Sequence, residues 1–402
     1  MRQVFLWQVR KQKRALPRRI DLRYDKEEKG GKAMKKHYYW GVGLLVAMGL
    51  LAGCTQADSP KKEAAKTAQT TTLQKEPYKQ EKFLLGTYTR IRIYDKGKET
   101  ALKPAFARIE TLGDEITIND KGSEIDEINA QAGIQPVKVT DDIYYLLKEA
   151  YAYSVKSNGG FNMTIGAITQ LWRIGFADAR KPAQAEIDEA LKHIDYHKVQ
   201  FDDQAKTVYL TEKGMIIDLG AIAKGYITDE VVKVLQKNKV STAIVDLGGN
   251  VFVVGHSPRG TEEPWTIGIQ DPNSARGNVL GTIKETNKTV VTSGIYERFL
   301  EVDGKKYHHI FDSKTGYPYE NDIASVTVVT DKSIDGDGLT TVVFDKGVKA
   351  GLEYIEKETP KGTNAIFVTK EGRVYVTDGL KNNFKLGGDS GFEMGQREEL
   401  TK

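Results

Sequence analysis

The chain has 402 residues, of which 39% are apolar and 28% charged, a balance typical of a globular protein rather than a disordered one. Basic residues are concentrated early: residues 1–53 hold 13 Lys and Arg against 4 Asp and Glu, and the remainder holds 46 against 51. That acidic remainder gives no reason to expect nucleic acid as a partner. The single cysteine, Cys54, excludes an intramolecular disulfide and a cysteine-based zinc site.

Residues 34–53 have the features of a secretory signal peptide. Two lysines follow Met34, an uncharged and largely apolar run covers residues 38–51, and small residues precede Cys54. The run is shorter than the roughly 20 residues that a membrane-spanning helix needs. Leu-Ala-Gly-Cys at 51–54 resembles the bacterial lipobox, in which the cysteine is lipidated, for example with palmitate, and becomes the new N-terminus. We therefore expect a lipoprotein anchored through Cys54 on the outer (extracellular or periplasmic) face of the cell membrane. The alternative is an uncleaved anchor with a buried cysteine.

The segments on either side of this signal have different compositions. Residues 1–33 are strongly basic and mixed with acids, which does not suit a position ahead of a signal peptide. We hypothesise that translation starts at Met34 and that residues 1–33 are a wrongly assigned start or a cleaved extension. Residues 54–81 contain almost nothing apolar, so the sequence predicts a flexible tether.

Residues 82–395 show no repeat and no internal linker, and the sequence predicts one α+β domain of mixed sheets with packed helices. Alternating apolar residues at 83–93 predict a strand, and helical spacing of apolar residues predicts a helix over 102–112. Further helices are predicted over 140–157 and 182–193, the first capped by Thr140. Paired strands are predicted on either side of 202–203 and of 248–249, and a strand is predicted to end at Asp218.

The best local motif lies at 216–226, Ile-Ile-Asp-Leu-Gly-Ala-Ile-Ala-Lys-Gly-Tyr. Its pattern predicts a strand that ends at Asp218, a glycine turn, and a helix with Lys224 in the first turn. A cation is poorly placed there for helix stability, whereas the N–H groups and dipole of a helix start suit phosphate. Lys224 therefore indicates a polyphosphate ligand. The alternative is an ordinary strand–helix turn with a solvated lysine.

A second motif is Asp-Gly-Asp-Gly-Leu-Thr-Thr at 335–341. If a helix starts near Asp337, this residue and Thr341 share one face of the helix. A carboxylate beside a hydroxyl offers the hard oxygen ligands of a Mg²⁺ that also holds substrate phosphates. The alternating acids and closing glutamate of an EF-hand are missing. The alternative is an acidic cap on a core helix.

A third group combines Ser293 with His308 and His309. The Gly-x-Ser-x-Gly pattern of a nucleophile elbow does not surround Ser293, which disfavours a catalytic triad. Adjacent residues of a strand point to opposite sides, so at most one of the two histidines faces a site.

Four motifs together resemble the ApbE family of FAD:protein FMN transferases. They are Asp-Leu-Gly-x-Ile-x-Lys-Gly-Tyr, Thr-Ser-Gly-x-Tyr-x-Arg, His-Ile-x-Asp-x-x-Thr-Gly and Asp-Gly-Leu-x-Thr, and the resemblance spans about residues 83–350. It implies FAD as substrate, a Mg²⁺ against the diphosphate, and transfer of FMN to Thr or Ser hydroxyls of secreted or membrane acceptor proteins, with release of AMP.

The resemblance also implies roles for individual residues. The metal is bound by the side chains of Asp337 and Thr341 and by the backbone carbonyl of Ala221, and His309 matches the candidate base. The positions that match flavin-binding residues, with the last two nearer the ribityl and phosphate part, are Leu85, Asn119, Gly160, Phe161, Asn162, Phe311, Asp218 and Lys224.

Three positions depart from the family pattern. Asn162 and Ser313 stand where the family usually has Asp and Pro, changes that we expect to adjust contacts only. At Asn119 an aromatic ring often stacks on the flavin, and without it flavin retention is weaker and water competes with the acceptor. Two alternatives follow: a Mg²⁺-dependent FAD pyrophosphatase that releases FMN and AMP, and an FAD-binding lipoprotein without chemistry.

Overall fold

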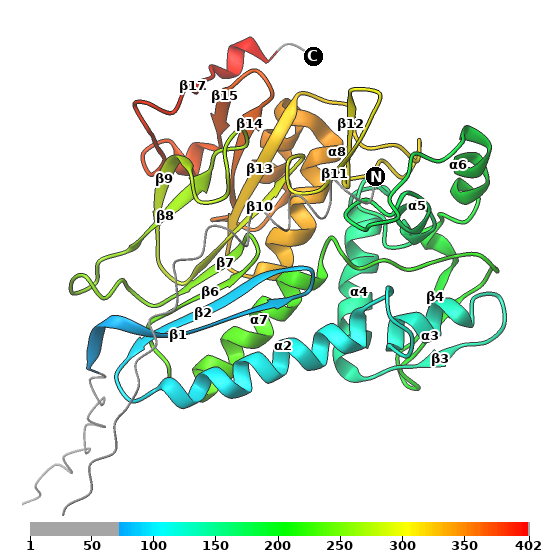
Figure 1. The fold of residues 1–402 in the computed structure, drawn as a ribbon, viewed down its shortest axis with the longest axis horizontal. Coiled ribbons are helices and arrows are strands. Elements are labelled where there is room, and N and C mark those ends of the chain that lie inside the picture. Colours follow the sequence, from blue (N-terminus) through cyan, green and yellow to red (C-terminus); the bar gives the residue numbers. More distant parts are fainter. Residues whose placement is uncertain (1–71, 401–402) are drawn as a thin grey trace, which may run out of the picture. The chain divides into compact units, whose positions relative to one another are not determined.

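A computed structural model describes residues 72–400 of the chain, which belong to a single compact unit (Figure 1). The predicted extension, the signal peptide, Cys54 and most of the predicted tether lie outside the described residues. The described part contains seven α-helices and four β-sheets, which confirms the predicted α+β class.

The main sheet of the described region has nine strands, and all neighbours are antiparallel except the last pair. In spatial order these strands are β1 (Leu73–Leu84), β2 (Thr87–Asp95), β6 (Ala243–Leu247), β7 (Asn250–Val254), β10 (Lys288–Gly294), β13 (Ile323–Thr330), β14 (Asn364–Thr369), β15 (Arg373–Val376) and β17 (Glu393–Met394). The predicted strand pair around 248–249 is thus the β6–β7 hairpin.

Both faces of this sheet are covered. The helices α2 (Leu102–Ile116), α7 (Ala223–Lys237) and α8 (Ser333–Glu358) pack on one face (Figure 1). The second sheet, formed by β8 (Trp265–Gln270), β9 (Val279–Glu285) and β16 (Lys385–Leu386), packs on the other. Every residue of the interior strand β13 is consequently buried. Burial on both faces explains why its sequence, Ile-Ala-Ser-Val-Thr-Val-Val-Thr, contains no charged residue.

A smaller helical region adjoins the α-helical face. It contains α3 (Glu124–Ala130), α4 (Asp141–Lys156), α5 (Gly166–Trp172) and α6 (Gln184–Leu191), the three-stranded sheet of β3 (Val137–Lys138), β5 (Thr207–Leu210) and β4 (Val199–Asp202), and the hairpin of β11 (Phe299–Val302) and β12 (Lys305–His308). The predicted helices over 102–112, 140–157 and 182–193 correspond to α2, α4 and α6. The Thr140 hydroxyl caps α4 by accepting the N–H of Ile143.

Three sequence predictions about element boundaries were wrong. Residues 73–81, predicted as tether, lie in β1, because pairing with β2 satisfies their backbone groups without a continuous apolar run. Within the described residues, ordered structure therefore extends further toward the N-terminus than residue 82, to Leu73. The segment before Asp218 forms only an isolated bridge, Ile165 to Ile216, instead of a strand. Helix α8 begins at Ser333, one turn before Asp337.

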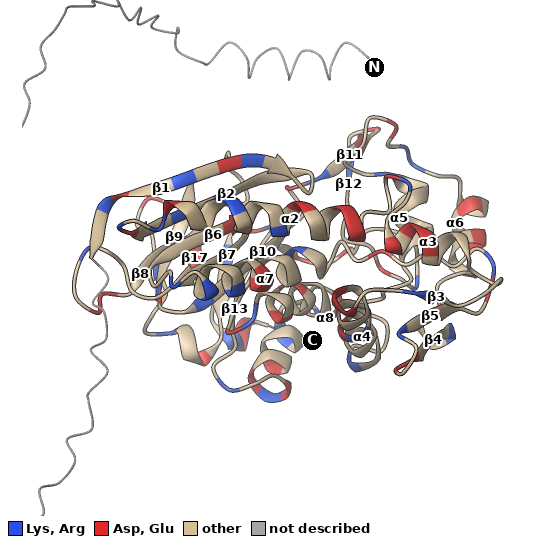
Figure 2. Cartoon of the chain, turned by 90° about the horizontal axis from the view of Figure 1, so that it is seen from below, with Lys and Arg blue, Asp and Glu red and all other residues tan. Residues whose placement is uncertain are grey.

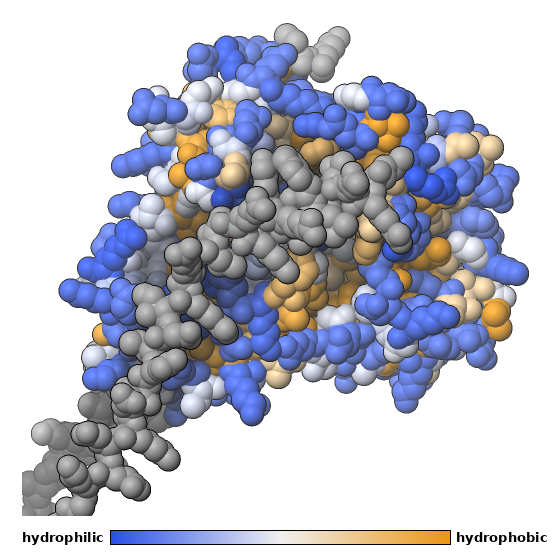
Figure 3. All heavy atoms as spheres, viewed as in Figure 1, coloured by the Kyte–Doolittle hydropathy of each residue, from blue (hydrophilic) through white to orange (hydrophobic). Residues whose placement is uncertain are grey.

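Charged and polar side chains dominate the visible surface, with apolar patches scattered between them (Figure 3). Within residues 72–400 no helix has the length and apolar character needed to cross a membrane.

Candidate active site

The centre of the site is the place where the first turns of α7 and α8 meet. Gly225 permits this approach, because a Cβ there would lie 2.3 Å from the carbonyl oxygen of Ser333. Each helix then caps the other. Asp229 of α7 accepts the N–H groups of Ser333 and Ile334 at 2.7 and 2.9 Å, and Asp337 of α8 accepts the N–H of Gly225 at 2.9 Å.

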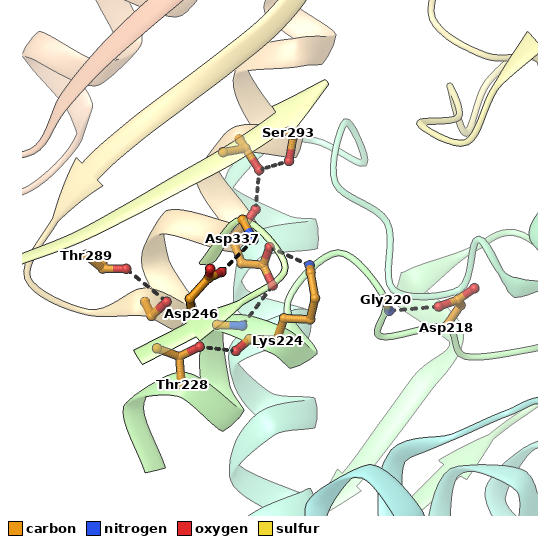
Figure 4. A network of polar contacts seen from close by, with 12 residues as sticks. Asp218, Gly220, Lys224, Thr228, Asp246, Thr289, Ser293 and Asp337 are labelled. Atoms are coloured by element: carbon orange, nitrogen blue, oxygen red, sulfur yellow. Dashed lines mark hydrogen bonds and ion pairs between the residues drawn. The ribbon is translucent and has the colours of Figure 1, made fainter. Parts of the chain in front are cut away.

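Asp337 also pairs with Lys224. The Nζ of Lys224 lies 3.3 Å from Oδ1 of Asp337, and the Asp337 side chain is only 3% exposed (Figure 4). The structure therefore brings together the lysine of one sequence motif and the aspartate of another, 113 residues apart. A buried carboxylate held by one cation and one backbone N–H is fixed in orientation before any ligand arrives.

The donor set around Asp337 fits a hard cation such as Mg²⁺. The Gly225 N–H donates to Asp337, so the carbonyl of Ala221, four residues earlier, does not receive the bond that a regular helix would give it. Thr341 lies one turn after Asp337 and is half-buried. Among residues 72–400 no three His, Cys, Asp or Glu side chains cluster to hold a metal by themselves, so one carboxylate would act with neutral oxygens and substrate phosphates.

A chain of hydroxyl groups connects this centre to β10. Ser293 donates to the Thr340 hydroxyl at 2.8 Å, and Thr340 donates to the carbonyl of Asp337 at 2.7 Å (Figure 4). Ser293 thus bonds to a threonine of α8 instead of a histidine, which agrees with the sequence argument against a triad.

Asp218 is held in the loop before α7. Its Oδ1 accepts the Gly220 N–H at 2.8 Å, and its Oδ2 accepts the hydroxyl of Thr169 in α5 at 2.6 Å. The next residue of α5, Gln170, donates to the Oδ1 of Asn119 at 3.3 Å. Asn119 is exposed, and the adjacent residues Thr169 and Gln170 connect it to Asp218.

His309 follows directly after β12. Its ring contacts the backbone of Arg298, which lies just before β11. Its Nδ1 lies 3.2 Å from the backbone carbonyl oxygen of Arg298. Since a carbonyl only accepts, Nδ1 carries the proton and Nε2 is left as the acceptor. Desolvation, with the positive charges of Arg298 and Lys224, lowers the pKa of His309 to about 3. The ring is therefore neutral at physiological pH.

Arg298 also reaches the turn that carries Leu85. Its Nη2 contacts the carbonyl of Gly86 at 3.5 Å, in the β1–β2 turn where Leu85 has a φ of 54°. The predicted flavin residue Leu85 and the predicted base His309 therefore flank the same arginine. His308, by contrast, is buried and bonds to the carbonyl of Tyr319, and burial lowers its pKa to about 4.

The loop before α5 contains three predicted flavin-binding residues. Gly160 is packed so closely that a Cβ would lie 2.4 Å from Oδ2 of Asp345, and its carbonyl accepts the Tyr319 hydroxyl at 2.9 Å. The Oδ1 of Asn162 accepts both the N–H and the hydroxyl of Thr164. Asn162 therefore stabilises its own turn.

At two of the predicted flavin-binding positions the side chain is buried. Phe161 is 1% exposed and packs on Tyr153, and Phe311 is 7% exposed and packs on Trp172. Both rings belong to hydrophobic clusters, so they support the loops around the site instead of offering an open stacking surface. The sequence motifs alone did not show whether the Phe161 and Phe311 rings face a ligand or the protein core.

Sequence reasoning assigned no role to three residues that shape the site: Asp229, Thr340 and Arg298. Arg298 was visible as the last residue of the Thr-Ser-Gly-x-Tyr-x-Arg motif, and Thr340 lies beside the predicted ligand Thr341. The mutual capping by Asp229 depends on a contact between residues 104 positions apart, for which one sequence carries no signal.

The model of the ApbE family matches residues 85–367 of the chain. An FAD:protein FMN transferase of Klebsiella pneumoniae is 36% identical over 311 residues, which cover 77% of this chain and 95% of that protein. One of Treponema pallidum is 33% identical over 363 residues, covering 87% and 96%. The crystal structure of the ApbE protein of Thermotoga maritima superposes with a TM-score of 0.69 at 32% identity, covering 77% of this chain and 99% of that one. The chain belongs to the ApbE family.

Proposed function

We propose that this enzyme transfers FMN from FAD to Thr or Ser hydroxyls of acceptor proteins, in a Mg²⁺-dependent reaction that releases AMP. The observation that carries the proposal is the meeting of Lys224 and Asp337 at two adjoining helix starts, because it concentrates positive charge and a hard oxygen ligand at one point. The relatives of similar length bear the name of the same transferase activity.

Mg²⁺ would be held by the Asp337 carboxylate, the Thr341 hydroxyl and the Ala221 carbonyl. When bound, the ion would neutralise charge on the FAD diphosphate. Lys224 would supply a further positive charge, and its contact with Asp337 would then be exchanged for a phosphate oxygen.

The covalent step requires one proton acceptor. The acceptor hydroxyl oxygen would bond to the phosphorus of the FMN half, and the bond from that phosphorus to the bridging oxygen would break, so that AMP leaves with the electron pair. The hydroxyl proton would pass to Nε2 of His309. This nitrogen can accept it because the ring proton is on Nδ1, which donates to the backbone carbonyl of Arg298. The negative diphosphate would raise the low pKa of this ring and make it a better base.

A second candidate function, FAD hydrolysis to FMN and AMP, is favoured by Asn119. This residue is exposed and bonded to Gln170, and its amide offers no aromatic face to the flavin. Water would then compete with the acceptor hydroxyl for the same phosphorus. Both functions are tested by incubating the protein with FAD and Mg²⁺, with and without a co-expressed secreted acceptor. Mass spectrometry that finds no added FMN on Thr or Ser, while FMN and AMP accumulate, would leave hydrolysis as the function.

The lipid anchor at Cys54 is a further part of the proposal. Its support is the lipobox-like Leu-Ala-Gly-Cys sequence after an apolar run. An enzyme held on the outer face of the membrane would meet acceptors that are themselves secreted or membrane-bound.

A further inference from the structure

A cavity lies next to segments of the candidate active site, and the proposed function assigns it no role. Its volume is about 530 Å³, and it is bounded by the β11–β12 hairpin, the loop after β10 and the segment before β13. Aromatic rings form much of its wall: Tyr296, Phe299, Tyr307, Tyr317 and Tyr319. We call this cavity the hairpin groove.

The hairpin groove is basic, although the chain beyond residue 53 is acidic overall. Three lysines line it, Lys305, Lys306 and Lys370, against one acid, Glu320. Glu320 pairs with Lys305. Lys306 lies over the Phe299 ring with its Nζ 4.8 Å from the ring centroid. Lys306 and Lys370 are both exposed. The Nζ of Lys370 donates to the carbonyl of Asn321 and keeps further N–H donors for an incoming anionic group.

Three residues connect the hairpin groove to the candidate active site. His308 lines the groove, and the next residue is the candidate base His309. Ile295 lines it two residues after Ser293, which bonds to Thr340 beside Asp337. Tyr319 lines it and donates its hydroxyl to the carbonyl of Gly160. The hairpin groove and the candidate active site therefore share neighbouring residues of the β11–β12 hairpin, the loop after β10 and the segment before β13.

We propose that the hairpin groove binds an acidic segment of the acceptor polypeptide next to the Thr or Ser that receives FMN. This inference rests on the proposed transferase function and adds the chemistry by which the acceptor is recognised. Exposed lysines attract the acidic segment and set its orientation, and the aromatic walls contribute apolar contact area. A site for the polypeptide outside the FAD site is required, because a Thr or Ser hydroxyl alone carries no information about which protein should be modified.

The test uses two short, fluorescently labelled peptides, each with a single Thr. In one the Thr is flanked by Asp and Glu, and in the other by Lys. The groove variant carries Lys306→Glu and Lys370→Glu. The matched control carries Lys349→Glu and Lys361→Glu, which make the same charge change at exposed lysines away from the groove. Fluorescence anisotropy gives the peptide Kd, and in-gel flavin fluorescence with mass spectrometry gives FMN transfer.

Wild type should bind the acidic peptide in preference to the basic one. The groove variant should raise the Kd and the acceptor KM for the acidic peptide about tenfold, whereas the control should change neither appreciably. FAD binding and FMN release without acceptor should be the same in all three proteins, which also shows that the variants are folded.

Several outcomes overturn the docking inference: no preference in wild type, an equal effect of both double variants, or a solution dimer that only the groove variant dissociates, which would make a second copy the occupant. The two proposals fail separately. Peptide binding as expected without FMN transfer would count against the transferase function alone. Transfer with an unchanged acceptor KM in the groove variant would count against the groove alone.

Discussion

The carboxylate of Asp337 accepts hydrogen bonds from both Lys224 and the backbone of Gly225, so this one side chain joins the start of α7 to α8. The same residue is the only carboxylate in the proposed metal set. Its structural and chemical roles are therefore coupled, and experiments on it have to separate them.

Asp337→Ala should reduce FMN transfer by at least about 100-fold, because a hard ligand and a helix cap are both removed. Asp337→Asn keeps an oxygen that accepts the Gly225 N–H but lacks the charge. We expect this variant to unfold near the wild-type temperature and still to need far more Mg²⁺ for activity. Asp389→Asn, at an exposed position, is the control. Near-normal activity of Asp337→Asn at low Mg²⁺ would show that the metal assignment is wrong.

His309→Ala should lower the transfer rate by about 10²- to 10⁴-fold, the usual contribution of a general base. Because the pKa of His309 in the free enzyme is about 3, its ring stays neutral between about pH 5 and 8. A profile of kcat/KM against pH should therefore show no step from this ring in that interval. The exposed His197, changed to Ala, serves as control. A step near pH 6.5 that disappears only in His309→Ala would contradict the assigned environment.

Asn119→Tyr should bind FAD more tightly and release FMN more slowly when no acceptor is present. Stacking of a ring on the isoalloxazine contributes roughly 1 kcal/mol beyond burial, which corresponds to about fivefold in Kd. The exposed position of Asn119 leaves room for the ring. FMN release is followed by the rise in flavin fluorescence as the adenine departs, and Asn119→Ala shows what loss of the Gln170 contact does by itself. If wild type retains FAD for hours without producing FMN, the hydrolase alternative is removed.

Asp229 should make the free energy of unfolding depend on pH. Burial raises its pKa to about 6, above the ordinary value of 3.8 for an aspartate. The folded state therefore binds more protons than the unfolded state between these values, and the free energy of unfolding falls as pH rises through that window. Asp229→Asn should flatten this part of the profile while keeping a cap on α8. Asp229→Ala should destabilise by about 1–2 kcal/mol. Urea unfolding at several pH values measures both, and an unaltered profile in Asp229→Asn would assign the dependence to other groups.

Cys54→Ser should move the enzyme from membranes to the soluble fraction of the cell envelope or medium. Cys54 lies outside the described residues, and the candidate site is built entirely from residues beyond 84, so FMN transfer in solution should be unaffected. Fractionation and activity assays of cells that express each form give the answer. Membrane association that persists in Cys54→Ser would indicate an uncleaved helix.

The sequence was sufficient to predict the motifs that meet at the site, because each motif combines turn, helix-start and ligand chemistry within a few residues. Lys224 in a first turn and Asp337 one helix turn before Thr341 are local patterns, and both lie where they were expected. Their proximity to each other was inferred from the family resemblance. It depends on the close contact of Gly225 with Ser333, which local patterns do not encode.

The features that were hardest to predict are those decided by contacts between segments. Strand β1 has few apolar residues and is ordered by its pairing with β2. The Phe161 and Phe311 rings face the core because Tyr153 and Trp172 lie behind them. In each case a contact with another segment determined whether residues were ordered or which way a side chain pointed, and the apolar pattern of the segment itself does not encode that contact.

Strand β1 also affects how copies of the enzyme behave when they are concentrated. It forms one edge of the nine-stranded sheet and carries Pro77, an irregular register between Leu73 and Tyr78, and alternating lysines and glutamates (Figure 2). The opposite edge, β17, is only two residues long. Each feature discourages the pairing of one sheet edge with another. Many molecules could therefore be crowded together on a surface without their sheets joining into aggregates.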